Sequence, residues 1–283
     1  MTNKPLDDAG AAQKPLDLQQ NRPHSARMYD VYLSGKTNYA VDREAAAQVA
    51  EVYPGIYTCA RENRDFMHRA TRVIAEEYGI RQWLDIGTGI PTSPNLHEVA
   101  QSIVPDARIV YADHDPIVLA HARALLDSTP EGRTTYVQAN VTEPDTILSD
   151  PELTDTLDLT KPVALSLNAL MHFVTDAMDP YGIVDHLMGA LPSGSVLALS
   201  HCTPDFDPET WQKVTDIYNA SGTPVQFRSK EEVTKFFDGL DLAEPGISVG
   251  HRWRPQLGHI RRSPDAEPSD ALVSLWAGVG IKP

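Results

Sequence analysis

The sequence predicts an α/β protein with a doubly wound, mostly parallel, Rossmann-like sheet of seven strands. After residue 79, apolar segments with strand character alternate with segments of helical periodicity. Repeats of strand, helix and strand form parallel sheets through right-handed crossovers. The strands predicted for the parallel part cover residues 82–86, 108–113, 134–139, 163–169 and 195–200.

The helices between these strands are expected to begin at a shared signal, a capping side chain followed by proline at the first helical position. The signal occurs at Ser93-Pro94, Asp115-Pro116, Asp179-Pro180 and Asp207-Pro208. Towards the C-terminus, a helix predicted over 229–238 is followed by two strand-like runs, 246–253 and 271–281. We expect these two strands to pair antiparallel at one edge of the sheet.

Three segments make up the predicted domain organisation. Residues 1–24 are polar with few large apolar side chains, which predicts a disordered tail. Residues 25–79 have helical patterns, including an apolar stripe of 3.6-residue period from Ile56 to Ile74, and are expected to form an N-terminal helical extension or lid. Residues 80–283 are expected to form the ligand-binding domain.

Composition and charge disfavour several kinds of partner. The chain has 24 Lys and Arg against 39 Asp and Glu, a formal net charge of −15, which disfavours nucleic acid and anionic membranes. Cys59 and Cys202 lie far apart and lack metal-binding spacing, so a reduced, cytoplasmic setting is expected. The most apolar segment, 163–174, is too short to span a bilayer, and the start of the chain has no signal-peptide pattern.

The loop after the first strand carries the strongest functional signal. The strand ends on Asp85, and Gly87 and Gly89 flank Thr88 in the following turn. Glycines there let the backbone turn sharply and let a ligand approach. Asp85 can hold an ammonium group beside these glycines, so the loop favours a ligand with an amino acid end; a plain tight turn is the structural alternative.

A dinucleotide site is less consistent with the same loop. Its pattern requires a third small residue where Thr92 stands. Pro91 and Pro94 also remove two backbone N–H donors that would hold a pyrophosphate.

Polar side chains also follow the second and third strands. Asp113 ends the second strand, where an ionised carboxylate can accept both hydroxyls of a ribose, while Asp115 is better explained as a helix cap. A metal site at Asp113-His114-Asp115 is disfavoured because neighbouring side chains of a strand point apart. Asn140 follows the third strand and either contacts an adenine amino group or forms a turn.

These strand ends resemble those of the class I S-adenosylmethionine-dependent methyltransferases over residues 80–283. The chain is more similar still to an actinobacterial family of methyltransferases whose substrate is unknown. The stretches that carry this similarity are residues 26–39, 60–64, 84–92 and 112–116 together with Ser200-His201. Two positions depart from the family pattern, since Asn140 stands where Asp is usual and Ser34 where Gly is usual.

The resemblance implies that S-adenosylmethionine is the cofactor and that a methyl group moves to an oxygen or nitrogen of a small molecule by in-line displacement. The acidic-glycine loop then holds the methionine end, the second strand's carboxylate holds the ribose, and the third strand's end flanks the adenine. The expected cofactor-binding residues are Asp85, Gly87, Thr88, Gly89, Asp113, His114, Asn140, Val141, Asn168, Asn63, Arg61 and Tyr29.

Three polar residues of the helical extension are candidates for the ligand site. Asn63 interrupts the apolar stripe and needs a hydrogen-bonding partner, which is either protein backbone or a ligand. Arg61 and its neighbour Arg64 have the geometry to bind the cofactor carboxylate, with a solvated helix face as the alternative.

Two histidines are candidates for a general base. His172 follows the fourth strand and His201 follows the fifth, and an imidazole can take a proton from a hydroxyl or amine acceptor. The alternative is that both only cap strand ends or line a pocket. No metal ligands are predicted.

The sequence leaves two other functions open, that of an NAD-dependent oxidoreductase and that of a non-catalytic S-adenosylmethionine-binding sensor or interaction protein. The missing third small residue of the glycine loop counts against the first. The expected partner is a small-molecule methyl acceptor, and the oligomeric state is left open between monomer and homodimer.

Overall fold

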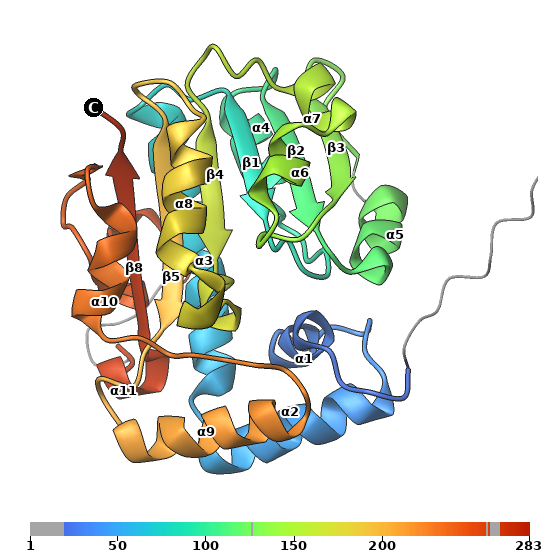
Figure 1. The fold of residues 1–283 in the computed structure, drawn as a ribbon, viewed down its shortest axis with the longest axis vertical. Coiled ribbons are helices and arrows are strands. Elements are labelled where there is room, and N and C mark those ends of the chain that lie inside the picture. The colour runs from blue at the N-terminus through green and yellow to red at the C-terminus, as the bar shows by residue number, and fades with distance from the viewer. Residues whose placement is uncertain (1–19, 126, 259, 261–266) are drawn as a thin grey trace, which may run out of the picture.

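A twisted sheet runs through the middle of the molecule, with helices on both faces (Figure 1). The computed structural model describes residues 20–125, 127–258, 260 and 267–283. The strands of the sheet lie in the order β3-β2-β1-β4-β5-β8-β6, and β7 pairs with another part of β8. The strands are β1 Gln82–Ile86, β2 Arg108–Asp113, β3 Arg133–Gln138, β4 Ala164–Asn168, β5 Val196–Cys202, β6 Asp241–Leu242, β7 Ser248–Val249 and β8 Leu275–Ile281.

The predicted fold class is confirmed. Strands β1 to β5 are parallel to one another, and β8 runs antiparallel to β5, β6 and β7. The α-helices are α1 Ser25–Tyr32, α2 Ala40–Val52, α3 Ile56–Glu76, α4 Leu96–Ile103, α5 Pro116–Leu125, α6 Pro144–Leu148, α7 Pro151–Thr156, α8 Pro180–Gly189, α9 Pro208–Ala220, α10 Lys230–Thr234 and α11 Asp270–Val273. Short 3-10 helices are η1 Met171–Phe173, η2 Asp176–Met178, η3 Lys235–Phe237, η4 Gly250–Arg252 and η5 Pro255–Leu257.

The C-terminal edge differs in detail from the predicted pair of strands. The run 246–253 contributes only the two-residue β7, and β6 adds a second short strand, so eight strands form the sheet. The Arg69 guanidinium donates to the carbonyl oxygens of Gly250 (2.6 Å) and Trp253 (2.7 Å). These carbonyls are therefore bonded to α3 and not to a neighbouring strand.

Three of the four predicted helix starts are confirmed by capping hydrogen bonds. Asp115, Asp179 and Asp207 each accept an N–H two or three residues further on. The start predicted at Ser93-Pro94 is wrong, because α4 begins at Leu96. Its cap is Asn95, which forms a capping box with Glu98.

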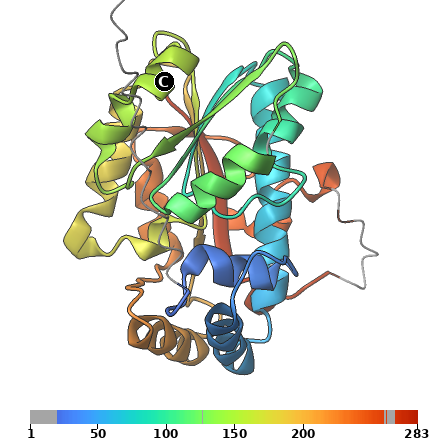
Figure 2. The same ribbon diagram turned by 90° about the vertical axis from the view of Figure 1, so that its right-hand side faces the viewer.

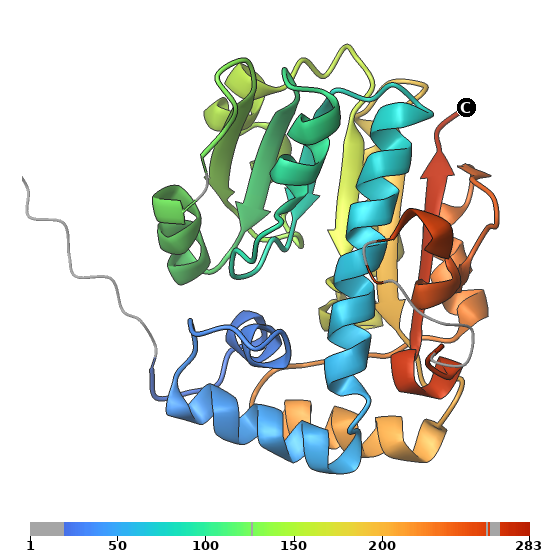
Figure 3. The ribbon, with the colours of Figure 1, turned by 180° about the vertical axis from the view of Figure 1, so that it is seen from behind.

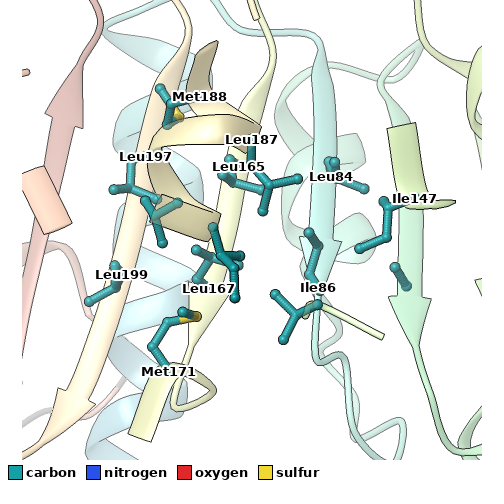
Figure 4. Close-up of a cluster of buried hydrophobic side chains, with 14 of the residues drawn as sticks. Leu84, Ile86, Ile147, Leu165, Leu167, Met171, Leu187, Met188, Leu197 and Leu199 are labelled. Carbon is teal, nitrogen blue, oxygen red and sulfur yellow. The ribbon is translucent and has the colours of Figure 1, made fainter. Parts of the chain in front are cut away.

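Apolar side chains fill both sides of the sheet. On the face seen in Figure 1, α6, α7, α8 and η3 cover a cluster of buried apolar side chains. Leu84, Leu165 and Leu197 of this cluster are 1% exposed or less (Figure 4). On the opposite face lie α3, α4 and α5 (Figure 3). The regular alternation of strand and helix buries these clusters.

Helix α3 belongs to these layers. Phe66, Ala70 and Ile74 of α3 are fully buried in the cluster that contains Trp83 of β1. The sequence placed all of residues 25–79 in one helical extension, but only α1 and α2 stand clear of the sheet faces (Figure 3).

Beyond the carboxyl ends of the strands, α1 and α2 lie with α9 (Figures 1 and 2). We call these three helices the cap. Their shared apolar cluster includes Met28 and Tyr32 of α1, Val49 of α2, and Trp211 and Val214 of α9. The cap is thus built from two parts of the chain that are distant in sequence.

The predicted tail covers residues 1–24, of which 1–19 lie outside the described residues. Residues 20–24 are described, and Arg22 and His24 contact the helices that follow. His24 caps α1 by accepting the N–H of Ala26, and its own N–H donates to Asp42 (2.9 Å). Among the helices of the described ranges, none combines the length and apolarity that crossing a membrane requires.

We expect Phe66→Ala to lower the free energy of unfolding by about 3–5 kcal/mol, because Phe66 of α3 is fully buried and packs edge-on against Trp253. Urea denaturation followed by circular dichroism measures this change. Met178→Ala is the control, since Met178 is 42% exposed and its truncation should change the stability by less than about 0.5 kcal/mol. A small effect of Phe66→Ala would place α3 outside the core.

Candidate active site

Two adjoining cavities lie at the carboxyl ends of the parallel strands, which is where ligands bind in open α/β sheets. Their volumes are about 180 Å³ and 360 Å³. The lining residues that they share are His24, Ser25, Gly87, Asp113, His114, Leu170 and Phe173. The cavities are therefore two parts of one site, covered by the cap.

The glycine loop lines both parts of the site. Gly87 and Gly89 have φ angles of +73° and +65°, in the region that favours glycine. A Cβ at Gly87 would lie 2.6 Å from Leu170, whereas a Cβ at Gly89 would meet no atom within 4 Å. Gly87 is therefore required for close packing, and Gly89 faces open space. Thr88 donates from its hydroxyl to the carbonyl oxygens of Asp85 and Ala112.

Asp85 lines the first cavity near the glycines and is partly buried. Burial raises the pKa of its carboxyl to about 7, although a hydrogen bond with Ser166 and the charge of Arg64 act in the opposite direction. A cationic group bound beside Asp85 would stabilise the ionised form.

Arg64 of α3 reaches the same end of the first cavity. Its guanidinium donates to the carbonyl oxygens of Thr92 and Pro94, the latter at 2.7 Å, and the ring of His68 lies 2.9 Å from the Pro94 oxygen. These contacts fasten the glycine loop to α3. The solvated-face alternative does not describe Arg64.

Asp113 connects the loop to the end of β2. It is 6% exposed, and its two oxygens accept the N–H groups of Gly89 (3.0 Å) and Asp115 (2.9 Å). A carboxylate can accept about four hydrogen bonds, so capacity for a ligand hydroxyl remains. His114 is mostly exposed at the mouth of the site, where its ring lies 5.6 Å from that of His24.

The second cavity includes the end of β3. Asn140 and the buried Val141 both line it. Asn140 is exposed, and its side-chain oxygen accepts the N–H of Thr142 (3.1 Å), so it forms the turn that the sequence offered as the alternative role. A contact of Asn140 with an adenine stays a prediction.

Asn63 obtains its hydrogen bonds from protein side chains. Its amide donates to the Tyr29 hydroxyl (2.8 Å) and accepts from the Ser200 hydroxyl (2.5 Å). Tyr29 in turn donates to the carbonyl oxygen of Ala60 (3.1 Å), and burial raises the pKa of its phenol to about 12. Asn63 and Tyr29 both line the first cavity and link α1, α3 and β5 around it.

Asn168 has a free hydrogen-bonding atom in the same cavity. Its amide nitrogen donates to the hydroxyl of Ser166 (2.7 Å), but its buried side-chain oxygen has no partner among the described residues. An unpaired buried acceptor costs about 1–3 kcal/mol, which a bound donor would recover.

The structure does not bring Arg61 to the site. Arg61 is exposed on a side of α3 that does not face the cavity, and its guanidinium contacts Thr58 (3.3 Å). This corrects its assignment as a cofactor-binding residue. The periodicity of α3 is the reason, since positions 60, 63, 64 and 67 line the cavity while 61 does not.

The two candidate bases have different environments. His172 lines the first cavity, and its buried Nδ1 has no hydrogen-bonding partner among the described residues. Burial, with the nearby charge of Arg228, lowers the pKa of His172 to about 3, so its imidazole is neutral at physiological pH.

His201 is fully buried and lines neither cavity. One ring nitrogen bonds the carbonyl oxygen of Cys202 (2.7 Å), and the other lies 3.1 Å from the guanidinium of Arg228. Both nitrogens are therefore occupied, and the prediction of His201 as a base is corrected to a role in packing.

Arg228 is a structural residue that the sequence reasoning missed. It is fully buried and donates to the carbonyl oxygens of Met171 (3.0 Å) and Val174 (2.9 Å) and to the carboxylate of Asp176 (2.7 Å). These bonds hold the segment that carries His172. An arginine that directly follows Phe227 in the alternating apolar and polar run from Val225 was the available signal.

Part of the first cavity is lined by aromatic side chains that were also missed, namely Trp211, Tyr218 and Phe227. Positions 211, 214 and 218 lie on one face of α9, which is the spacing of an apolar helix face. That spacing indicates burial but not what the face covers. In the part of the chain that the structure describes, no group of three or more His, Cys, Asp or Glu side chains is placed to hold a metal ion.

This strand order, with a ligand site at the carboxyl ends of the strands, is that of the class I methyltransferases. The model of the S-adenosyl methyltransferase family matches residues 11–283, and the chain belongs to that family. It is therefore a methyltransferase whose cofactor is S-adenosylmethionine, which decides against an NAD-dependent oxidoreductase. No significant match is found among the curated proteins.

Solved structures agree with this assignment. A DUF574 family protein from Streptomyces avermitilis is 47% identical with a TM-score of 0.89, over 93% of this chain and 99% of that chain. A candidate methyltransferase from Thermobifida fusca is 35% identical with a TM-score of 0.85, over 96% and 99%. An O-methyltransferase family protein from Burkholderia thailandensis, 12% identical over 94% and 65% with a TM-score of 0.51, shares the fold.

We expect Gly87→Ala to weaken binding of S-adenosylhomocysteine about tenfold or more, because the new methyl group would displace Leu170 in the wall of the site. Isothermal titration calorimetry measures the affinity. Gly79→Ala is the matched control, since Gly79 has a φ of +65° with open space around it and lies outside both cavities. Equal losses in the two variants would mean that backbone strain alone is responsible.

Proposed function

We propose that this chain transfers the methyl group of S-adenosylmethionine to an oxygen or nitrogen of a small molecule held beneath the cap. The observation that carries the proposal is the single site with two chemically different parts. Carboxylates, glycines and an unpaired amide oxygen lie at the strand ends. Aromatic side chains from the cap, together with Phe173 and Phe227, line the rest. Incubation with labelled cofactor and a pool of small metabolites, followed by mass spectrometry, tests it; absence of cofactor binding would overturn it.

The methionine end of the cofactor fits the glycine loop. Asp85 and the unpaired oxygen of Asn168 are the acceptors that an ammonium group needs, and Arg64 supplies a cation for the carboxylate. The open space at Gly89 leaves room for this end of the molecule. Gly87, Thr88, Asn63 and Tyr29 then maintain the shape of the cavity around it.

The nucleoside end fits the part of the site that the two cavities share. Asp113 would accept the ribose hydroxyls, and His114 covers the mouth beside it. Val141 provides an apolar surface and Asn140 a polar edge for the adenine. The seven lining residues common to both cavities support a ligand that extends from one into the other.

When bound, the sulfonium cofactor supplies a methyl carbon, which forms a bond to the acceptor as its bond to sulfur breaks. The residues of this chain position the two reactants and exclude water, which are the main contributions that an in-line displacement needs. The cap provides the exclusion, since α1 and α9 cover the site from the side opposite the strands.

His172 would accept the proton that the acceptor releases. Its low pKa makes it a weak base towards a free hydroxyl, but the hydroxyl becomes strongly acidic once its oxygen has bonded to the methyl carbon. The proton therefore moves late in the reaction and passes from His172 to solvent. Arg228 is a positioning residue, because it holds the segment that carries His172.

A small-molecule acceptor agrees with the charge and the enclosure of the site. The net charge of −15 disfavours nucleic acid as the substrate. We also propose a cytoplasmic location, since Cys59 and Cys202 are free thiols. A monomer and a homodimer are both compatible with this proposal, because residues of one chain suffice to line both cavities.

We expect Asp113→Ala to weaken binding of S-adenosylmethionine by about 1–3 kcal/mol, the usual cost of removing a charged hydrogen-bonding partner. Calorimetry measures the change, with circular dichroism beside it to confirm folding. Asp106→Ala, which removes an exposed carboxylate outside both cavities, should leave the affinity unchanged. Unchanged affinity in folded Asp113→Ala would contradict the ribose assignment.

Binding of S-adenosylhomocysteine should depend on pH through Asp85. Only the ionised carboxylate of Asp85 would hold the ammonium group. Because the pKa of Asp85 is about 7 in the free protein, its ionised fraction falls about tenfold for each pH unit below that value. Affinity should therefore rise with pH and be about tenfold weaker at pH 6 than at its plateau. Asp85→Asn should bind weakly with a flat profile; a profile that keeps its slope in this variant would assign the titration to another group.

A further inference from the structure

The part of the first cavity that faces the cap has a distinct composition. Its wall, which we call the aromatic pocket, consists of Tyr32, Phe173, Trp211, Tyr218 and Phe227. Apolar side chains such as Val214 and Leu275 complete it. The charged side chains that line the first cavity, Arg64, Asp85 and Asp113, instead lie against the glycine loop.

The rings of the aromatic pocket form a continuous surface. Trp211 and Phe227 pack at 4.5 Å between centroids with an interplanar angle of 70°, and Phe173 lies 6.0 Å from Tyr218. His172 contacts both Phe173 (4.4 Å) and Phe227 (5.7 Å), so its imidazole lies within this wall. Ring faces and edges that meet at such angles suit a flat aromatic guest.

The polar atoms of the pocket are few and uncharged. The hydroxyls of Tyr32 and Tyr218 lie 3.5 Å apart and pair with each other. Two buried nitrogens, Nδ1 of His172 and Nε1 of Trp211, have no partner among the described residues. The imidazole nitrogen can bond a hydroxyl, and the indole N–H can donate to an oxygen. The nearby Arg228 lines neither cavity and is already paired with Asp176, so an ionised guest would lose its hydration here without meeting a free opposite charge in the wall.

We propose that the methyl acceptor is an uncharged, flat aromatic molecule whose hydroxyl bonds to His172, and this rests on the function proposed above. The hydroxyl oxygen receives the methyl group, and its proton passes to His172 and then to solvent. A second, hydrogen-bond-accepting oxygen on the guest would satisfy the indole of Trp211. Carboxylated aromatics and saturated alcohols of the same size are excluded.

Four probes of one size test this class of acceptor by calorimetry on the full chain saturated with S-adenosylhomocysteine. 2-Naphthol is the expected ligand. Of the other three, 2-naphthoate carries a negative charge, 2-methoxynaphthalene lacks the hydroxyl donor, and decahydro-2-naphthol lacks the aromatic rings. At pH 7.5 we expect 2-naphthol to bind at least about tenfold more tightly than each of the others. Equal or tighter binding of any of them, or no binding of 2-naphthol, would overturn the proposal.

Variants connect the selectivity to the pocket. Phe227→Leu should weaken the binding of 2-naphthol about tenfold and leave the affinity for S-adenosylhomocysteine within about twofold. Phe206 lies outside both cavities, so Phe206→Leu should change neither affinity. His172→Phe keeps an aromatic ring and should abolish the preference for 2-naphthol over 2-methoxynaphthalene. A preference that survives in His172→Phe would refute the hydroxyl contact.

The two proposals fail in different ways. Loss of S-adenosylhomocysteine binding in the unmodified chain would refute the proposed cofactor site. Normal cofactor binding with no preference among the four probes would refute only the acceptor class. Labelled methyl transfer to 2-naphthol, detected by mass spectrometry, would support both.

Discussion

The burial of α3 against the sheet is the constraint on which the site depends. The helix must cover the sheet face with residues such as Phe66 and Ile74, and this sets its rotation and height. The same rotation brings Asn63 and Arg64 to the strand ends, where Arg64 fastens the glycine loop through the carbonyl of Pro94. Helix packing and the geometry of the proposed cofactor site therefore have one cause.

The site separates charge from aromatic surface. Backbone and carboxylate groups lie at the strand ends, because parallel strands bring their carboxyl termini to one edge of the sheet. Most of the aromatic surface comes from α9 and the segment around Phe227, which follow β5 in the chain, and Tyr32 of α1 and Phe173 of η1 complete it. A sulfonium cofactor and an uncharged acceptor would each occupy the part that suits their chemistry. His172 lies in the aromatic wall beside Phe173, whose side chain lines both cavities.

Local patterns predicted the elements that local forces determine. The strands, three capped helices and the glycine turn follow from apolar periodicity, capping chemistry and positive φ angles. The helix start predicted at Ser93-Pro94 was wrong because Asn95 and Glu98 form the capping box at the same helix end. The strand predicted over 246–253 was shortened because distant Arg69 binds its carbonyl groups. Both differences involve partners that the local pattern did not weigh.

By itself, the sequence determined the fold class and the residues most expected to hold the cofactor, since Asp85, Gly87, Gly89 and Asp113 follow strands at a shared edge. Only the tertiary structure decided between residues of similar type. It placed Arg64 in the cavity and Arg61 outside it, and it left His172 unpaired while Arg228 occupied His201. These outcomes depend on helix rotation and on contacts across long sequence separations, which no local pattern encodes.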